Sequence, residues 1–149
     1  MTQVRSRPAS DPYYDLGDFG RQIKTDSTEA QIWFNRGLTW LYCFNHEEAC
    51  KCFEQVIAHD ANCAMGYWGL AFAAGPNYNK TWAAYSDEDL RAAVIKCSGI
   101  VETAVAKSVS SPGLEVALIR ALTKRYSIEG VVHDFSGPNK DYADAMREV

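Results

Sequence analysis

The sequence has no long hydrophobic run. No window approaches the roughly 20 apolar residues that a membrane-spanning helix needs. Its first ten residues, MTQVRSRPAS, also lack the apolar core of a secretory signal. Positive charge is not in excess, since 15 lysines and arginines stand against 19 aspartates and glutamates. We therefore expect a cytoplasmic protein that binds neither membranes nor nucleic acid.

Catalytic and strand-forming patterns are missing as well. The sequence shows no Ser/His/Asp order, no phosphate-binding glycine loop and no paired-carboxylate pattern. No segment alternates apolar and polar residues with the period of a half-buried strand. The five cysteines are an odd number in a chain without an export signal, so we expect reduced thiols and not a disulfide framework. These absences favour an all-α protein with no recognised enzymatic motif.

Apolar residues recur instead at steps of three and four, which is the period of one helix face. Capping residues, glycine and proline mark where helices begin or end. The predicted helices span residues 27–45, 47–60 and 64–74, and further helices begin at Ser86, at Ser111-Pro112 and near Tyr142. Residues 1–26 contain prolines, glycines and scattered charges. We expect them to form an irregular lead-in before a helical domain over residues 27–149.

An internal repeat accompanies these helices. A shift of 34 residues, a period typical of helix-turn-helix arrays, pairs Trp33 with Tyr67, Gly37 with Ala71, Trp40 with Ala74, Ala49 with Ala83 and Val56 with Leu90. The first unit has the order aromatic, small, aromatic, alanine, phenylalanine at Trp33, Gly37, Trp40, Ala49 and Phe53. This order resembles the tetratricopeptide repeat, in which small residues let paired helices approach closely. The chain departs from that pattern at Arg36, Ala61 and Asp87, where leucine, proline and an aromatic residue are usual.

Residues 44–79 resemble a particular subgroup of this family, namely large bacterial and fungal tetratricopeptide proteins. The motifs that carry the resemblance are FNHEEA, CAMGYWG and GPNYN. It implies antiparallel helix pairs stacked as a short right-handed solenoid that acts as a scaffold. Members of the subgroup are several times longer, so we expect this chain to be either the N-terminal part of a longer protein or a truncated relative. Such an incomplete array would expose apolar surface at its last helix and self-associate.

The stretch CFNHEEACKCF, residues 43–53, places three cysteines, a histidine and two carboxylates close together. Cys43, His46 and Cys50 lie three and four residues apart, so on a continuous helix they would share one side, as metal ligands do. However, a turn at residues 45–46 interrupts that side. Cys50 falls among the apolar positions, where a free cysteine packs as a small hydrophobic residue. We interpret the stretch as the turn between two helices and not as a metal site.

His46 and Cys63 support an alternative hypothesis, because both belong to the subgroup signature. The protein would then be an accessory enzyme of (secondary) metabolism that uses a metal or haem near these two residues. A thiolate of Cys63 at a helix start would gain acidity from the backbone amides. The commoner role of a buried histidine is a hydrogen bond to a backbone carbonyl. We expect no cofactor and keep the metal or haem site as the alternative.

The loop GPNYNKTW, residues 75–82, is the stronger candidate binding segment, because it is longer than a connection between repeat helices needs. Its amides, cation and aromatic faces suit a peptide or small ligand, and the candidates are Asn77, Tyr78, Asn79, Lys80 and Trp82. The equal alternative is that the asparagines only stabilise a turn and the aromatic residues only fill space. The family resemblance adds candidates on the concave side of the first helix, namely Asn35, Arg36 and Thr39. Our first hypothesis is a non-enzymatic scaffold or adaptor that holds a protein or peptide segment at these residues.

Overall fold

The computed structural model describes residues 4–126 and 134–149. Within these ranges the chain forms six α-helices and no strand, which confirms the prediction of an all-α fold. The helices are α1 (Thr28–Tyr42), α2 (His46–His59), α3 (Ala64–Ala74), α4 (Asp87–Lys107), α5 (Gly113–Arg125) and α6 (Ser136–Arg147). Two short 3-10 helices, η1 (Trp82–Ala84) and η2 (Ser108–Ser110), precede α4 and α5.

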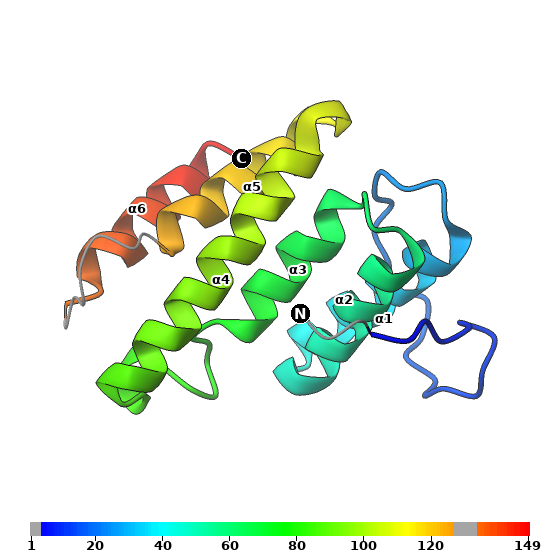
Figure 1. Ribbon diagram of the computed structural model, residues 1–149, viewed down its shortest axis with the longest axis horizontal. Coiled ribbons are helices and arrows are strands. Elements are labelled where there is room, and N and C mark those ends of the chain that lie inside the picture. Colours follow the sequence, from blue (N-terminus) through cyan, green and yellow to red (C-terminus); the bar gives the residue numbers. More distant parts are fainter. Residues whose placement is uncertain (1–3, 127–133) are drawn as a thin grey trace.

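The helices pack as antiparallel pairs, α1 with α2, α3 with α4 and α5 with α6, and each pair lies against the next (Figure 1). This is the stacked arrangement that the sequence predicted. Helix α3 lies at the centre, because it contacts both helices of the first pair as well as α4 and α5. The loop that follows α3 therefore lies close to residues of all three helix pairs.

Local capping explains where the helices begin. The side-chain oxygens of Ser27, Asn45 and Ser86 each accept a hydrogen bond from the backbone N–H three residues later, at 3.1, 3.2 and 3.2 Å. Such caps satisfy amides that have no partner inside the helix. Helix α3 ends at Gly75-Pro76, as predicted, because proline cannot continue it. Helix α6 begins at Ser136, earlier than predicted, and none of its residues is fully buried.

The second helix pair does not keep the 34-residue period. That shift pairs Ala49 of α2 with Ala83, but Ala83 lies in η1, before α4 begins. The residue that takes the place of Ala49 is Leu90, which lies four residues after the cap of α4, as Ala49 lies four residues after the cap of α2. Both are buried. The difference arises from the long connection over residues 75–86.

Phe53 of α2 fills the contact between the first two pairs. Its ring lies between Gly37 of α1 and Gly69 of α3, and a Cβ atom added at these glycines would lie 2.8 and 2.4 Å from Phe53 Cε1. No side chain fits in that space. The two glycines therefore let α1 and α3 approach the fully buried ring from opposite sides.

Residues 4–26 form no helix but are packed against the helices, at the α1–α2 end of the molecule (Figure 1). We call them the N-terminal segment. Ala9 and Ile23 belong to the same buried cluster as the helical core, with exposed fractions of 6% and 4%. The predicted division at residue 26 thus marks the start of helical structure, whereas the core continues across it.

Burial departs from the apolar pattern at two places. Cys52 is fully buried, whereas Cys50, which falls among the apolar positions, is half-buried and packs against the core. The apolar pattern predicts that Leu114 lies inside, but it is 45% exposed, whereas its neighbour Glu115 is buried at 5%. Phe53 and Val56 of α2 and Ala121 and Leu122 of α5 are buried, so each helix still turns its apolar side to the core.

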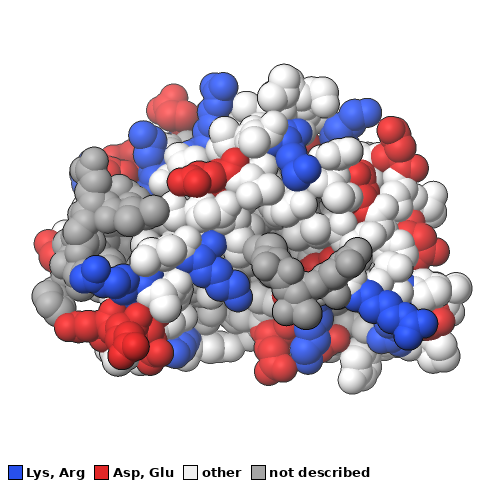
Figure 2. All heavy atoms as spheres, in the orientation of Figure 1, with Lys and Arg blue, Asp and Glu red and all other residues white. Residues whose placement is uncertain are grey.

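Charges of both signs are interspersed on the face that Figure 2 shows. None of the helices in residues 4–126 and 134–149 combines the length and apolarity that crossing a membrane requires.

Candidate binding pocket

The loop after α3 is stabilised by the side chain of Asn77. Its Oδ1 accepts hydrogen bonds from the backbone N–H groups of Asn79 and Lys80, at 2.9 and 3.1 Å, and its Nδ2 donates to Gly75 O at 3.1 Å. The backbone N–H of Asn77 also donates to Lys80 O at 2.9 Å. These are the bonds of an asparagine-supported turn. Asn77 is therefore used to shape the loop.

The same loop docks on the turn between α1 and α2. Asn79 Nδ2 donates to Phe44 O at 2.6 Å, and the rings of Phe44 and Tyr78 meet edge to face at 5.6 Å. Phe44 has a φ of 61°, a left-handed conformation that is uncommon for a non-glycine residue. The docked loop helps to hold this conformation. The FNH and GPNYN motifs thus belong to one local structure.

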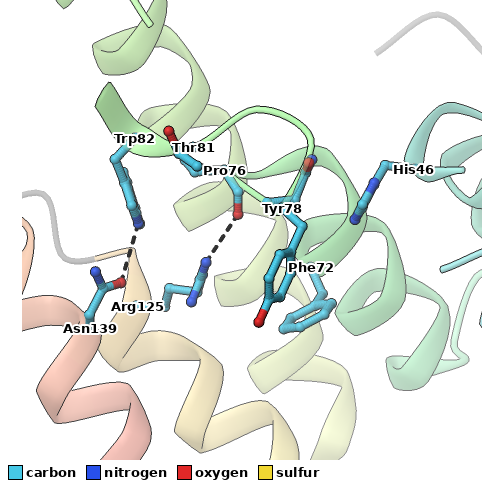
Figure 3. Close-up of a pocket in the computed structure, with 9 residues that line it drawn as sticks. His46, Phe72, Pro76, Tyr78, Thr81, Trp82, Arg125 and Asn139 are labelled. Atoms are coloured by element: carbon cyan, nitrogen blue, oxygen red, sulfur yellow. Dashed lines mark hydrogen bonds between the residues drawn. The ribbon is translucent and has the colours of Figure 1, made fainter. Parts of the chain in front are cut away.

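A surface pocket of about 340 Å³ lies beside this loop. We call it the loop pocket. It brings together residues from all three helix pairs and from the loop (Figure 3), namely His46, Phe72, Pro76, Asn77, Tyr78, Thr81, Trp82, Arg125 and Asn139. Of the lining side chains that the structure describes, three are aromatic and none is a carboxylate. The pocket therefore offers apolar walls and a positive field.

Arg125 supplies the positive charge. Its Nη2 donates to Pro76 O at 3.0 Å, and its guanidinium carbon lies 5.6 Å from the Trp82 ring and 5.3 Å from the Tyr142 ring. These contacts fix the guanidinium in place. Within residues 4–126 and 134–149, no carboxylate forms an ion pair with Arg125. Among the described residues, the groups that contact the charge of Arg125 are aromatic faces and a carbonyl.

Trp82 forms the wall next to Arg125. Its Nε1 donates to Asn139 Oδ1 at 3.2 Å, and its ring stacks on Phe135 with centroids 4.5 Å apart and an interplanar angle of 12°. The indole is thus held by α6 and by the residue that precedes it. This preorganisation lowers the entropy cost of using the ring as a contact surface.

His46 lies on the opposite side of the pocket and points toward it (Figure 3). Its Nδ1 lies 3.1 Å from Phe44 O. A carbonyl can only accept, so Nδ1 is the donor and, in the neutral ring, Nε2 carries the lone pair. A ligand N–H or O–H group in the pocket can therefore donate to Nε2.

The structure brings together only part of the predicted loop site. Asn77, Tyr78 and Trp82 line the pocket, but Asn79 and Lys80 do not. Asn79 is bonded to the α1–α2 turn, and Lys80 Nζ lies 3.9 Å from the centre of the Tyr85 ring. The expectation that both asparagines present free amides is not met, because the loop itself needs their hydrogen bonds.

Three residues of the pocket come from other helices and were not among the predicted site residues, namely Phe72, Arg125 and Asn139. The apolar pattern of residues 114–122 predicts that Arg125 lies on the outward side of α5, and nothing in its local pattern links it to the loop. Only the packing of α5 against α3 places it beside Pro76.

The predicted concave-side residues are in contact with the chain itself. Arg36 Nη2 donates to Ala9 O at 2.8 Å, and Asn35 Oδ1 accepts from the backbone N–H of Arg21 at 3.1 Å. Thr39 Oγ1 donates to Asn35 O at 3.1 Å. All three predicted residues line a hollow of about 310 Å³ whose other wall is formed by residues 14–19. The N-terminal segment therefore occupies much of this predicted partner surface.

The alternative pair, His46 and Cys63, does not form one site. His46 begins α2 and Cys63 follows its end, and the 14 residues of the helix span roughly 20 Å. Burial raises the pKa of the Cys63 thiol to about 11, which outweighs the hydrogen bonds from backbone N–H groups at the start of α3. Among the described residues, no group of three His, Cys, Asp or Glu side chains is placed to hold a metal ion.

Comparisons with family models, with curated proteins and with solved structures found no match for this chain. The resemblance to tetratricopeptide proteins thus rests on the motifs in the sequence. The geometry of the pocket, with aromatic walls, one cation and one imidazole acceptor, is suited to binding an anionic group attached to an apolar body.

Proposed function

We propose that the protein is a non-enzymatic, tetratricopeptide-type binding module that holds a segment of a protein partner in the loop pocket. The segment carries an acidic side chain next to an aromatic one. The observation that carries this proposal is the guanidinium of Arg125, which lies in an aromatic pocket whose lining, within the described part of the chain, includes no acidic residue. A charge in such surroundings favours an anionic ligand.

The groups that remain for a ligand support this choice. Arg125 uses one N–H for Pro76 O and has further donors, and a guanidinium can bind both oxygens of a carboxylate. The faces of Phe72 and Tyr78 provide apolar contact for a neighbouring ring. His46 Nε2 accepts from an N–H of the bound segment. These groups recognise three different chemical features of one short peptide.

Other features favour binding of protein over catalysis or nucleic acid. None of the residues that line the loop pocket, all within the described ranges, is a serine or cysteine nucleophile. The net charge of −4 disfavours a phosphate backbone as the partner. The five cysteines are free thiols, which supports a cytoplasmic location.

The test uses two capped peptides, Gly-Phe-Glu-Gly and Gly-Phe-Gln-Gly, which differ only in the charge of one side chain. We expect the wild-type protein to bind the Glu peptide about tenfold more tightly than the Gln peptide, because a charge-assisted bond to Arg125 is lost with glutamine. The substitution Arg125→Gln should abolish this preference. Isothermal titration calorimetry measures the four dissociation constants, and circular dichroism confirms that the variant is folded.

The matched control is Lys124→Gln, which removes an exposed cation next to Arg125 that does not line the pocket. This variant should keep the full preference for the Glu peptide. The proposal fails if the wild type binds neither peptide, or if Arg125→Gln prefers the Glu peptide as strongly as the wild type does.

A further inference from the structure

The main chain of the N-terminal segment is bound by side chains of α1 and α2. Gln55 Nε2 donates to Arg5 O at 3.1 Å, and Gln55 Oε1 accepts from the backbone N–H of Arg7 at 2.6 Å. Arg7 O accepts from Trp33 Nε1 at 3.0 Å and from His59 Nε2 at 2.7 Å. The two helices thus hold an irregular, non-helical chain through its backbone groups.

The same pattern continues at the next alternate residue. The backbone N–H of Ala9 donates to Glu29 Oε2, and Ala9 O accepts from Arg36 Nη2 at 2.8 Å. Ala9 is 6% exposed, so there is room for a small side chain only. Residues 5, 7 and 9 are therefore bound through their main chain. At residue 9 the helices also select a small side chain.

Tyr13 is the second residue of the segment whose side chain the helices select, and this side chain is large. Its hydroxyl donates to Glu48 Oε1 at 3.0 Å, accepts from Trp40 Nε1 at 2.9 Å and lies 3.2 Å from Cys52 Sγ. The guanidinium carbon of Arg36 lies 4.3 Å from the centre of the Tyr13 ring. Four side chains from two helices thus surround one tyrosine. We call the side chains that bind residues 5–13 the peptide face, namely Glu29, Trp33, Arg36, Trp40, Glu48, Cys52, Gln55 and His59.

The bound segment contributes little to the apolar core. Within residues 4–22, Ala9 is the one buried residue, and Tyr14 and Phe19 are 67% and 54% exposed. Residues 14–19 also leave the hollow of about 310 Å³ between themselves and α1. Segments with few buried apolar contacts open at a lower free energy than the helical core does. Release of residues 5–13 would leave the polar groups of the peptide face without partners, so the face would accept an equivalent chain.

We propose that the peptide face is an exchangeable binding site, and that it binds residues 5–13 of a second copy of this chain when its own segment is released. The second copy fits because it brings the same two selected side chains, alanine and, four residues later, tyrosine. The attached segment has the advantage of a high effective concentration. Exchange therefore requires a high protein concentration or a weakened resident segment.

Hydrogen exchange of the wild-type protein tests whether the segment opens by itself. The backbone amides of Arg7 and Ala9 are bonded to Gln55 and Glu29, so they exchange only when the segment leaves. We expect them to exchange at least about a hundredfold faster than the amide of Leu38, in the buried part of α1. Equal protection of these amides would show that the segment leaves only on global unfolding, and the proposal would be wrong.

A labelled peptide tests binding from outside. The peptide VRSRPASDPYY, residues 4–14, is titrated against the full chain carrying Ala9→Asp and Tyr13→Ala, which weaken its own segment. We expect this variant to bind the peptide at least about tenfold more tightly than the wild type does. The matched control peptide carries the same two changes and should not bind.

Three results of the experiment with this variant would also contradict the proposal. The first is a folded variant that does not bind the peptide, and the second is equal binding of the two peptides. The third is a variant that cannot fold, since the segment would then be an integral part of the fold.

Discussion

The cysteine thiols of this protein differ in how far they are buried, and burial raises the thiol pKa. Cys52, Cys63 and Cys97 are buried, and desolvation raises the pKa of each from 9.0 to about 11. Cys43 is exposed. The sequence placed all these cysteines on helices or at their ends, but it could not distinguish Cys50 from Cys52, because that depends on which side of α2 faces the N-terminal segment.

The raised thiol pKa values predict a loss of stability at alkaline pH. A thiol with a higher pKa in the folded state stabilises the fold fully below its unfolded pKa of about 9, and this contribution disappears as pH rises through about 11. We therefore expect the urea midpoint to fall between pH 9 and 11. The double variant Cys63→Ala/Cys97→Ala should show a shallower fall than Cys43→Ala. Identical slopes in the two variants would show that these thiols are not responsible.

At the scale of the helices, the close approach of α1 and α3 to Phe53 predicts that a larger residue at Gly69 lowers the stability of the fold. A methyl group at Gly69 would overlap the ring, so Gly69→Ala should destabilise the protein by about 1–3 kcal/mol. The control is Gly99→Ala in α4, where a Cβ meets no atom within 4 Å. There alanine should stabilise the helix by about 0.5–1 kcal/mol. Denaturant unfolding measures both, and the prediction fails if Gly69→Ala is as stable as Gly99→Ala.

The limits of the helices could be predicted from the sequence, whereas their packing could not. The caps at Ser27 and Ser86 and the end at Gly75 depend on neighbouring residues, and the predicted helix limits follow from them. The position of Arg125 beside Pro76 depends on how α5 packs, and no local pattern contains that information. The loop was therefore identified as a candidate site, whereas Arg125, the charged group on which the proposed preference for anions rests, was not.

At the scale of the whole molecule, the N-terminal segment and the last pair are linked through one core. The backbone N–H of Lys24 donates to Glu115 Oε1 at 2.7 Å, which joins the segment to α5. The buried cluster extends from Ala9 to Tyr126 without interruption. The first hypothesis treated residues 1–26 as a lead-in beside an open concave face. The structure shows that the segment instead covers part of that face, which a repeat pattern within the helices cannot reveal.

This shared core predicts cooperative unfolding. Tyr126 is 2% exposed, and its hydroxyl donates to Ala71 O at 3.2 Å, so it connects the last pair with the central helix. We expect circular dichroism and tryptophan fluorescence to report a single transition in urea. Tyr126→Ala should lower the midpoint of that transition for both probes, at a cost of about 3–5 kcal/mol.

The control for this variant is Tyr78→Ala, because Tyr78 is 87% exposed and its loss should leave the midpoint nearly unchanged.

Arrays of repeats can also unfold pair by pair, since each repeat contacts only its neighbours. In that case Tyr126→Ala would split the unfolding curve, and fluorescence from the first pair, which contains Trp33 and Trp40, would keep the wild-type midpoint. A shift shared by both probes requires the core to act as one unit, because only then does the loss of one ring at the end of α5 destabilise α1.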